Sequence, residues 1–98
     1  MTIATASVSA TAYTPLTKGG TEAVIIISNW GTEVMELIFA TSLPAAATKG
    51  LLLPPTSTSC ISGLGTTEIA YLISRHGAAT VTFDYRTTGI MSLGEFNL

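Results

Sequence analysis

The side chains of this 98-residue chain that could act as acid or base catalysts are few and scattered. His76 is the only histidine, and the only aspartate, Asp84, follows eight residues later. A hydrolytic triad joins such a base and acid to a nucleophile, often a serine held at the strained turn of a G-x-S-x-G motif. The chain has no such motif. We therefore expect His76 to be a turn residue, Asp84 to be a charge near a strand end, and the protein not to be an enzyme.

The other carboxylates and the single cysteine do not suggest a catalytic, metal or cofactor site. Glu33 and Glu36 are three residues apart, which on a β-strand places them on opposite faces rather than in a glycosidase-like acid–base pair. Zinc sites use several Cys or His ligands, and Cys60 is the only cysteine. Gly63-Leu64-Gly65 lacks the further glycine and the helix of a nucleotide-binding loop. We interpret Cys60 as a small buried residue of a protein that folds in a reducing cytoplasm.

Trp30 is the best candidate for holding a ligand, because its ring could stack against a sugar. One ring is a small platform, and a tryptophan in a turn more often packs against a sheet edge or a partner. We therefore interpret Trp30 as an interface residue. A lectin-like carbohydrate-binding module is the alternative, since β-sandwiches often display aromatic side chains to sugars.

The composition indicates a protein that assembles with others. Charged residues make up 10% of the chain, whereas average soluble chains contain about 25%. Seventeen threonines and nine serines supply most of the polar side chains. A monomer with so few charges tends to associate, so we expect a homo-oligomer or a surface covered by a larger body.

Charge and hydropathy also argue against two kinds of partner. The net charge is −2 and the four basic residues are scattered, so we expect no nucleic-acid binding. The first ten residues lack the basic start and the apolar core of a signal peptide. The longest apolar run, 23–27, is too short to cross a bilayer, so we expect no membrane partner.

Short β-favouring runs, separated by turn residues about every ten positions, predict one all-β domain over residues 1–98. The expected architecture is a small β-sandwich or jelly-roll of six to eight short antiparallel strands with extended terminal arms. The predicted strands are 23–28, 33–39, 50–53, 57–62, 68–75 and 79–86. Residues 1–12 are expected to form an edge strand or arm, 13–15 a bend, 40–49 an ordered loop and 87–98 a C-terminal arm.

Two pairs of these strands are predicted to be hairpins. Strands 23–28 and 33–39 flank Asn29-Trp30-Gly31-Thr32, in which Asn and Gly accept positive φ at little cost. Strands 68–75 and 79–86 flank a turn at His76-Gly77. We interpret the first pair as the central hairpin of the domain.

Alternation along the strand 33–39 predicts which of its faces is buried. Met35, Leu37 and Phe39 share one face, and Glu36 marks the other as the wetter side. The C-terminal arm is also apolar. Its large side chains would be a liability if exposed, so we expect them to dock on the sandwich or on an adjacent subunit. With Trp30, the candidate interface residues are Ile90, Met91, Leu93 and Phe96.

Three segments spread over about residues 22–85 resemble small tailed-phage virion proteins with a β-sandwich fold. They read I-I-S-N-W-G-T-E-V-M-E, then K-G-L-L-L-P-P-T-S-T, then I-A-Y-L-I-S-R-H-G-A-A-T-V-T-F. The family pattern has a strand ending in Asn-x-Gly-Thr, a Gly-apolar-Leu-Pro strand, and a closing hairpin through a Gly turn. The matching positions are Asn29, Gly31, Thr32, Gly50, Leu53, Pro54, Ile69, Tyr71, Ile73, Ser74, Gly77, Thr80, Val81 and Thr82. The Pro54-Pro55 pair and the apolar tail depart from the pattern.

The resemblance implies a virion structural protein without catalytic residues. Its expected role is that of a capsid decoration, or cement, protein on the head shell, made in the host cytoplasm and assembled as a homotrimer. The expected partners are the major capsid protein or other virion proteins. A neck, tail or fibre component of the virion is the alternative within the same class.

Overall fold

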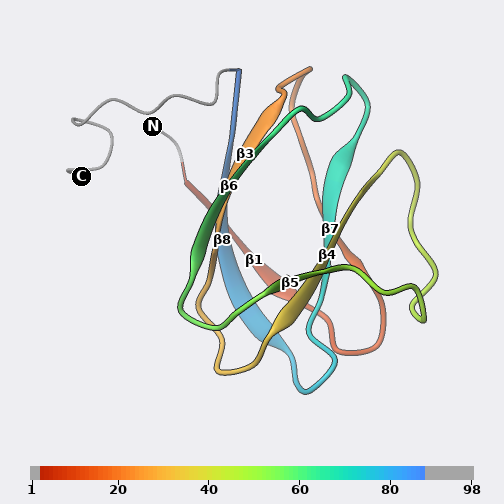
Figure 1. The fold of residues 1–98 in the computed structure, drawn as a ribbon, viewed down its shortest axis with the longest axis vertical. Helices are drawn as coiled ribbons and strands as arrows, with labels where there is room; N and C mark the ends of the chain where they lie inside the picture. The colour runs from red at the N-terminus through yellow and green to blue at the C-terminus, as the bar shows by residue number, and fades with distance from the viewer. Residues whose placement is uncertain (1–2, 88–98) are drawn as a thin grey trace.

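The computed structural model describes residues 3–87, which form eight antiparallel β-strands in two four-stranded sheets and no helix (Figure 1). The expected all-β fold is confirmed. Sheet A contains, in spatial order, β1 (Ala4–Val8), β8 (Ala79–Arg86), β3 (Val24–Asn29) and β6 (Thr58–Ser62). Sheet B contains, in spatial order, β2 (Thr14–Leu16), β7 (Ile69–Ile73), β4 (Met35–Ala40) and β5 (Leu51–Leu53).

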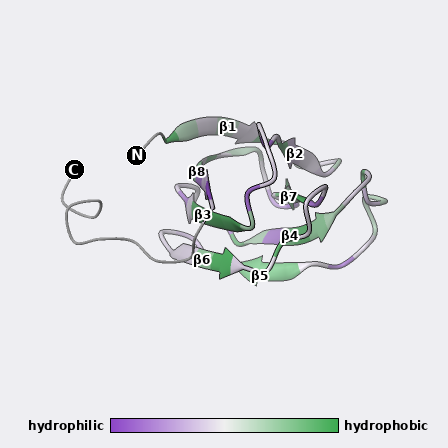
Figure 2. Ribbon diagram, turned by 90° about the horizontal axis from the view of Figure 1, so that it is seen from above, coloured by the Kyte–Doolittle hydropathy of each residue, from purple (hydrophilic) through white to green (hydrophobic). Residues whose placement is uncertain are grey.

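The first four strands pair, in reverse order, with the last four strands, so the chain forms one long antiparallel ribbon. β1 pairs with β8, β2 with β7, β3 with β6 and β4 with β5. Two more pairings, β3 with β8 and β4 with β7, roll this long ribbon into two facing sheets. That connectivity is a jelly-roll. Seen from above, sheet A lies on the left and sheet B on the right (Figure 2).

The core lies between the sheets and is built from the inward-facing side chains of each strand. Strand residues alternate between faces, so the core side chains of both sheets recur mainly at every second position. Burying one such Val, Leu or Ile side chain stabilises the fold by about 1.5–3 kcal/mol. The buried cluster consists of Val8, Leu16, Ile25, Ile27, Met35, Leu37, Leu53, Leu64, Ala70, Leu72 and Val81.

The predicted faces of β4 are correct. Met35 and Leu37 are buried in the core and Phe39 packs against it, whereas Glu36 lies on the outer face of sheet B. Sequence alternation therefore located the inner side of this strand without knowledge of its partners.

Both predicted hairpins are wrong. β3 belongs to sheet A and β4 to sheet B, so residues 29–32 carry the chain from one sheet to the other. The connection between β7 and β8 crosses between the sheets in the same way. Of the described strands, only β4 and β5 are both consecutive and paired, and a long loop joins them. A short turn between two apolar strands is compatible with either geometry, and the choice depends on which distant strands are available as partners.

The 29–32 corner also differs from a hairpin turn in its backbone. Among the described residues, positive φ occurs at Thr56, Gly63 and Gly77, and not at Asn29 or Gly31. Gly31 is required for a different reason, because a Cβ there would lie 2.7 Å from the Cβ of Ala79. The corner is thus tight because two connections pack against each other, not because the backbone is left-handed.

Two N-terminal elements lie at sheet edges. Residues 4–8 form β1 at one edge of sheet A, which agrees with the expected edge strand. The bend expected at residues 13–15 is wrong for its last two residues, which belong to the short edge strand β2, where Pro15 lies opposite Tyr71. Proline lacks an N–H donor and is tolerated in sheets at such edges.

The loop of residues 41–50 folds over the outer face of sheet B. There, Tyr71 and Ile73 are buried together with Tyr13, although they point away from the main core. Tyr13 Oη donates a hydrogen bond to the carbonyl of Thr48 in the loop. The expected ordered loop is therefore the cover of a second, smaller apolar cluster.

The Arg75–Glu36 ion pair and the hydrogen bonds of Arg75 hold this loop against sheet B. The guanidinium of Arg75 donates to Glu36 Oε2 (2.5 Å) and to the loop carbonyls of Ala46 (2.6 Å) and Thr48 (2.9 Å). The hydrogen bond from Arg75, and then that from the Gly50 N–H, lowers the pKa of Glu36 below its ordinary value. The longest loop of the described chain is thus tied to sheet B by hydrogen bonds between its backbone and the side chains of Tyr13, Glu36 and Arg75.

Candidate functional site

Trp30 stands at the corner where the chain leaves β3 of sheet A for sheet B. Its side chain is 67% exposed. Its backbone N–H donates to the carbonyl of Thr80 (3.1 Å) and its indole Nε1 donates to Thr82 Oγ1 (2.8 Å), both on β8. The ring is therefore open to solvent while its orientation is fixed by two hydrogen bonds.

Asn29 anchors the corner beneath Trp30. It is 1% exposed, and its Nδ2 donates to the carbonyls of Glu33 and Leu53, both at 2.9 Å. Its Oδ1 accepts from the N–H of Gly31 (2.8 Å). Because Leu53 belongs to sheet B, this side chain joins the two sheets through a buried, fully paired amide.

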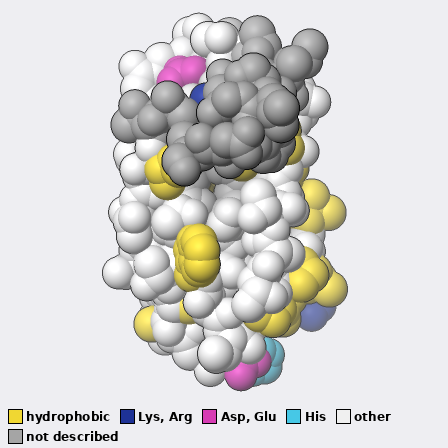
Figure 3. Space-filling model, turned by 90° about the vertical axis from the view of Figure 1, so that its left-hand side faces the viewer, with side chains coloured by type: hydrophobic (Ala, Val, Ile, Leu, Met, Phe, Trp, Pro, Cys, Tyr) yellow, Lys and Arg dark blue, Asp and Glu magenta, His cyan; other side chains and the backbone are white. Residues whose placement is uncertain are grey.

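A row of hydroxyl side chains crosses the four strands of sheet A on its outer face. The strand register places Thr5 opposite Thr82, Thr82 opposite Ser28, and Ser28 opposite Thr58. Ser28 Oγ and Thr58 Oγ1 are hydrogen-bonded at 2.7 Å, and Thr82 accepts from Trp30. Figure 3 looks at this side of the molecule, which displays mainly uncharged side chains around an isolated hydrophobic one.

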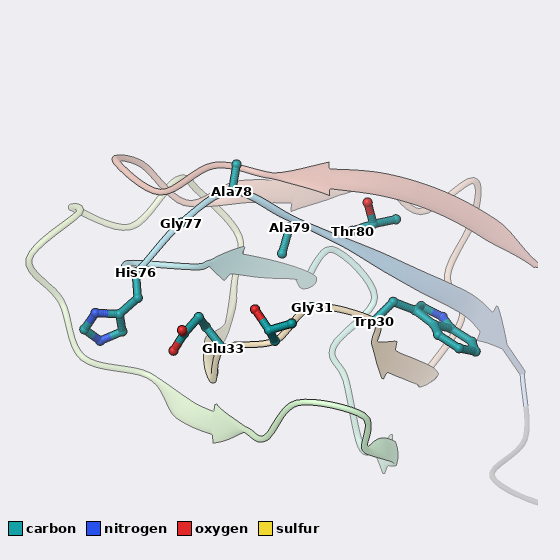
Figure 4. A pocket seen from close by; sticks show the side chains of 9 residues that line it. Trp30, Gly31, Glu33, His76, Gly77, Ala78, Ala79 and Thr80 are labelled. Atoms are coloured by element: carbon teal, nitrogen blue, oxygen red, sulfur yellow. The ribbon is translucent and has the colours of Figure 1, made fainter.

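A cleft of about 360 Å³ opens beside Trp30, between the β3–β4 corner and the β7–β8 connection. Trp30 lies at one end of it, and Glu33 and His76 lie together at the other (Figure 4). Small residues occupy the stretch between these ends and leave the cleft open. The complete lining is Trp30, Gly31, Thr32, Glu33, His76, Gly77, Ala78, Ala79 and Thr80.

The candidate acid–base residues do not form a triad or a carboxylate pair. His76 is exposed in the β7–β8 connection, whereas the carboxylate of Asp84 accepts from Arg86 Nε at 2.9 Å near the end of β8. Glu33 lines the cleft, and Glu36 is paired with Arg75 on the outer face of sheet B. Sequence spacing did not reveal that Glu33 and His76 line one cleft, because their two connections approach only in the rolled ribbon.

The interpretation of Cys60 as a buried residue is wrong, because the structure places it exposed on β6. β6 is an edge strand of sheet A, and Cys60 shares its outer face with Thr58 and Ser62. An alternating strand places a small residue inward or outward with equal ease, so residue type alone did not identify its face.

The free edge of sheet B carries exposed apolar side chains. β5 is the last strand in the order of that sheet, and Leu51 and Leu52 on it are 63% and 70% exposed. Leu43 in the covering loop is also exposed. Neighbouring exposed leucines on an edge strand are typical of a contact surface.

Several predicted features fall outside the residues that can be placed. Ile90, Met91, Leu93 and Phe96, the candidate interface residues of the C-terminal arm, lie outside the described residues.

Within residues 3–87, no cluster of three or more His, Cys, Asp or Glu side chains could hold a metal ion. The same part of the chain has no helix of the length and hydropathy needed to cross a membrane.

Comparisons with protein-family models, curated proteins and solved structures find no match to this chain.

Proposed function

We propose that this chain is a non-enzymatic structural protein of a phage virion, a decoration protein that binds and stabilises the head shell. The jelly-roll connectivity supports this proposal, because viral capsid domains use that fold. Fold supports the proposal only by analogy, since jelly-rolls also serve lectins and enzymes. The surfaces of the chain supply the more specific support.

The observation that carries the proposal is the apolar free edge at β5. Leu51 and Leu52 are both more than half exposed at a strand whose outer backbone groups have no partner within sheet B. An exposed apolar edge favours association with another chain, and natural proteins usually blunt such edges with charge or proline. In a virion this edge is covered permanently by a neighbouring subunit or by the shell.

The low charge of the outer face of sheet A fits the same role. Its hydroxyl row can form many weak, uncharged contacts with a flat neighbour. Terminal segments beyond the sandwich would then add contact area to other subunits. The partners in this proposal are the major capsid protein and further copies of the chain in a homotrimer.

The test is co-sedimentation of the purified protein with phage heads that lack it. We expect the wild-type protein to pellet with the heads in saturable amounts, and the double variant Leu51→Ser/Leu52→Ser to lose most of this binding. Ile3→Ser is the matched control, because Ile3 is an exposed apolar residue beside β1, away from β5. Failure of the wild-type protein to bind heads contradicts the proposal.

Two further measurements separate related roles. Analytical ultracentrifugation reports whether the chain forms a trimer, and immunogold labelling of virions locates it on the head, neck, tail or fibres. Labelling confined to the neck, tail or fibres replaces the decoration role with the alternative virion role. A gene position beside a major capsid gene supports a head protein.

A further inference from the structure

We propose that the cleft beside Trp30 is a binding site for a neutral saccharide. This inference does not depend on the virion role, because it concerns the surface of the isolated chain. It makes the carbohydrate-binding alternative specific by naming the cleft, the groups that line it and the class of sugar it accepts.

The first observation is that Trp30 is exposed and yet rigid. Trp30 is 67% exposed, and yet its backbone N–H and its indole N–H both donate hydrogen bonds to β8. The corner below it is fixed by the buried Asn29. A ring that is already oriented loses little conformational freedom on binding, which favours its use as a stacking platform.

The second observation is the chemistry of the cleft that extends away from the ring. Glu33 and His76 face the same end of the cleft, opposite Trp30 (Figure 4). A carboxylate accepts hydrogen bonds from sugar hydroxyls, and the hydroxyls of Thr32 and Thr80 can both donate and accept. The site thus combines one aromatic ring with several polar groups that a polyhydroxylated ligand can satisfy.

The third observation is that the cleft has room for such a ligand. Its volume of about 360 Å³ lies within the range of about 300–1,000 Å³ that is usual for small-molecule sites. The space exists because glycines and alanines line its middle, namely Gly31, Gly77, Ala78 and Ala79.

The lining favours a neutral sugar over other ligand classes. It contains no Lys or Arg, and the Glu33 carboxylate repels phosphate, sulfate and uronate groups. Trp30 is its only large apolar side chain, so a wholly apolar ligand would leave the polar groups of the cleft unpaired. A pyranose has an apolar C–H face for the indole and hydroxyls for the opposite end, and it matches both.

The cleft also adjoins the hydroxyl row of sheet A through Trp30. The same indole that borders the cleft donates to Thr82, from which the row continues through Ser28 to Thr58. A ligand of several sugar units can therefore extend from the cleft along this face. We expect oligosaccharides to bind more tightly than monosaccharides.

The experiment uses Trp30 as its own reporter, because it is the only tryptophan in the chain. The intact protein is titrated with neutral sugars, namely lactose, maltose, cellobiose, chitobiose and their longer homologues, while Trp30 fluorescence and its quenching by acrylamide are recorded. We expect a saturable change in emission and reduced quenching with at least one series. A glycan array widens the panel.

Variants test whether the binding arises at this site. Isothermal titration with the best sugar should show a loss of about tenfold or more for Trp30→Ala and for Glu33→Gln, as expected when a stacking or charge-assisted contact is removed. Glu68→Gln, which removes a carboxylate at the distant 65–68 turn, should bind like the wild type. Thermal unfolding of each variant verifies that it is folded.

The opposite results overturn the inference. They are no saturable response to any neutral sugar in the titration or on the array, equal binding by the Trp30 and Glu33 variants, or a preference for phosphorylated or sulfated sugars. The Leu51→Ser/Leu52→Ser variant separates this inference from the virion proposal, because it should lose head binding and retain sugar binding.

Discussion

On the outer face of sheet B, Tyr71 and Ile73 are 6% and 1% exposed, because they cluster with Tyr13, to which the loop of residues 41–50 is hydrogen-bonded. On the outer face of sheet A, the larger Trp30 stays 67% exposed above a row of hydroxyls. The chain thus buries apolar side chains on the outer face of sheet B with its own residues. The hydroxyl row on the outer face of sheet A stays at the surface.

The difference follows from what each outer face is made of. β7 and β4 direct large apolar side chains outward on sheet B, and these need a cover of their own to leave water. The hydroxyl row Thr82, Ser28 and Thr58 points outward from β8, β3 and β6 of sheet A, and such side chains remain soluble without a cover. A face that is stable while uncovered is also available to a partner, and the head-binding proposal uses this face together with the β5 edge of sheet B.

The largest expected effect comes from opening the covered face. Tyr13→Ala should lower the free energy of unfolding by about 3–5 kcal/mol, because it removes a buried ring together with its hydrogen bond to the loop. Trp30→Ala removes an even larger ring from the exposed face and should cost less than about 1 kcal/mol. Urea unfolding of both variants measures the contrast, and similar losses would show that the two faces do not differ as described.

The next effect concerns the corner that joins the two faces. Asn29→Ala should cost about 2–3 kcal/mol, because the buried carbonyl of Leu53 and the partly buried carbonyl of Glu33 lose their donor and the Gly31 N–H loses its acceptor. Ser28→Ala, one residue earlier on the outer face, should stay within about 0.5 kcal/mol of the wild type. Thermal unfolding compares the two, and an equally mild Asn29→Ala would mean that the corner does not depend on this amide.

A smaller effect tests how tightly the corner packs against the β7–β8 connection. Gly31→Ala would bring a Cβ to 2.7 Å from that of Ala79 and should cost about 1–3 kcal/mol. Adding Ala79→Gly removes the opposing atom and should recover part of that loss. A double-mutant cycle in urea measures the recovery, and strict additivity of the two changes would refute a direct contact.

The smallest effect is the acid sensitivity of the covered face. Hydrogen bonds from Arg75 and from the Gly50 N–H lower the pKa of Glu36 in the folded protein below its usual value of 4.5. The unfolded chain therefore binds a proton at Glu36 more readily, so its contribution to stability is present above pH 4.5 and declines as pH falls through the folded-state pKa. Side-chain exposures of 17% for Glu36 and 30% for Arg75 let solvent screen the pair and keep this effect small.

Unfolding free energies measured from pH 7 to pH 2 test this sign. Glu36→Gln and Arg75→Gln should each flatten the decline below pH 4.5 relative to the wild type. An unchanged acid decline in both variants would assign the sensitivity to other groups. Trp30→Phe is the control from the exposed face and should leave the decline unchanged.

Prediction from the sequence succeeded where a property depends on one strand at a time. The alternation Met35-x-Leu37-x-Phe39 identified the core side of β4, and the run 79–86 coincides with β8. It failed where a property depends on pairing. The two expected hairpins became sheet-to-sheet crossings. Cys60, expected to be buried, lies on the exposed outer face of β6.

Prediction of the candidate site succeeded and failed for the same reasons. Trp30 was recognisable as the single tryptophan in a turn. Two features required contacts between distant segments: Thr82, which holds the Trp30 ring, is 52 positions away, and Glu33 and His76 share a cleft with that ring. No local pattern encodes such contacts.

The amino-acid sequence by itself determined that this protein is an all-β domain with few charges, many hydroxyls and a tryptophan at a turn, because composition and period-two alternation are local properties. Only the tertiary structure decided that the ribbon rolls into a jelly-roll, that the 41–50 loop covers sheet B, and that the hydroxyl row of sheet A stays at the surface. The physical reason is that a short turn between apolar strands permits either a hairpin or a crossing. Burial of all the apolar faces together selects between them.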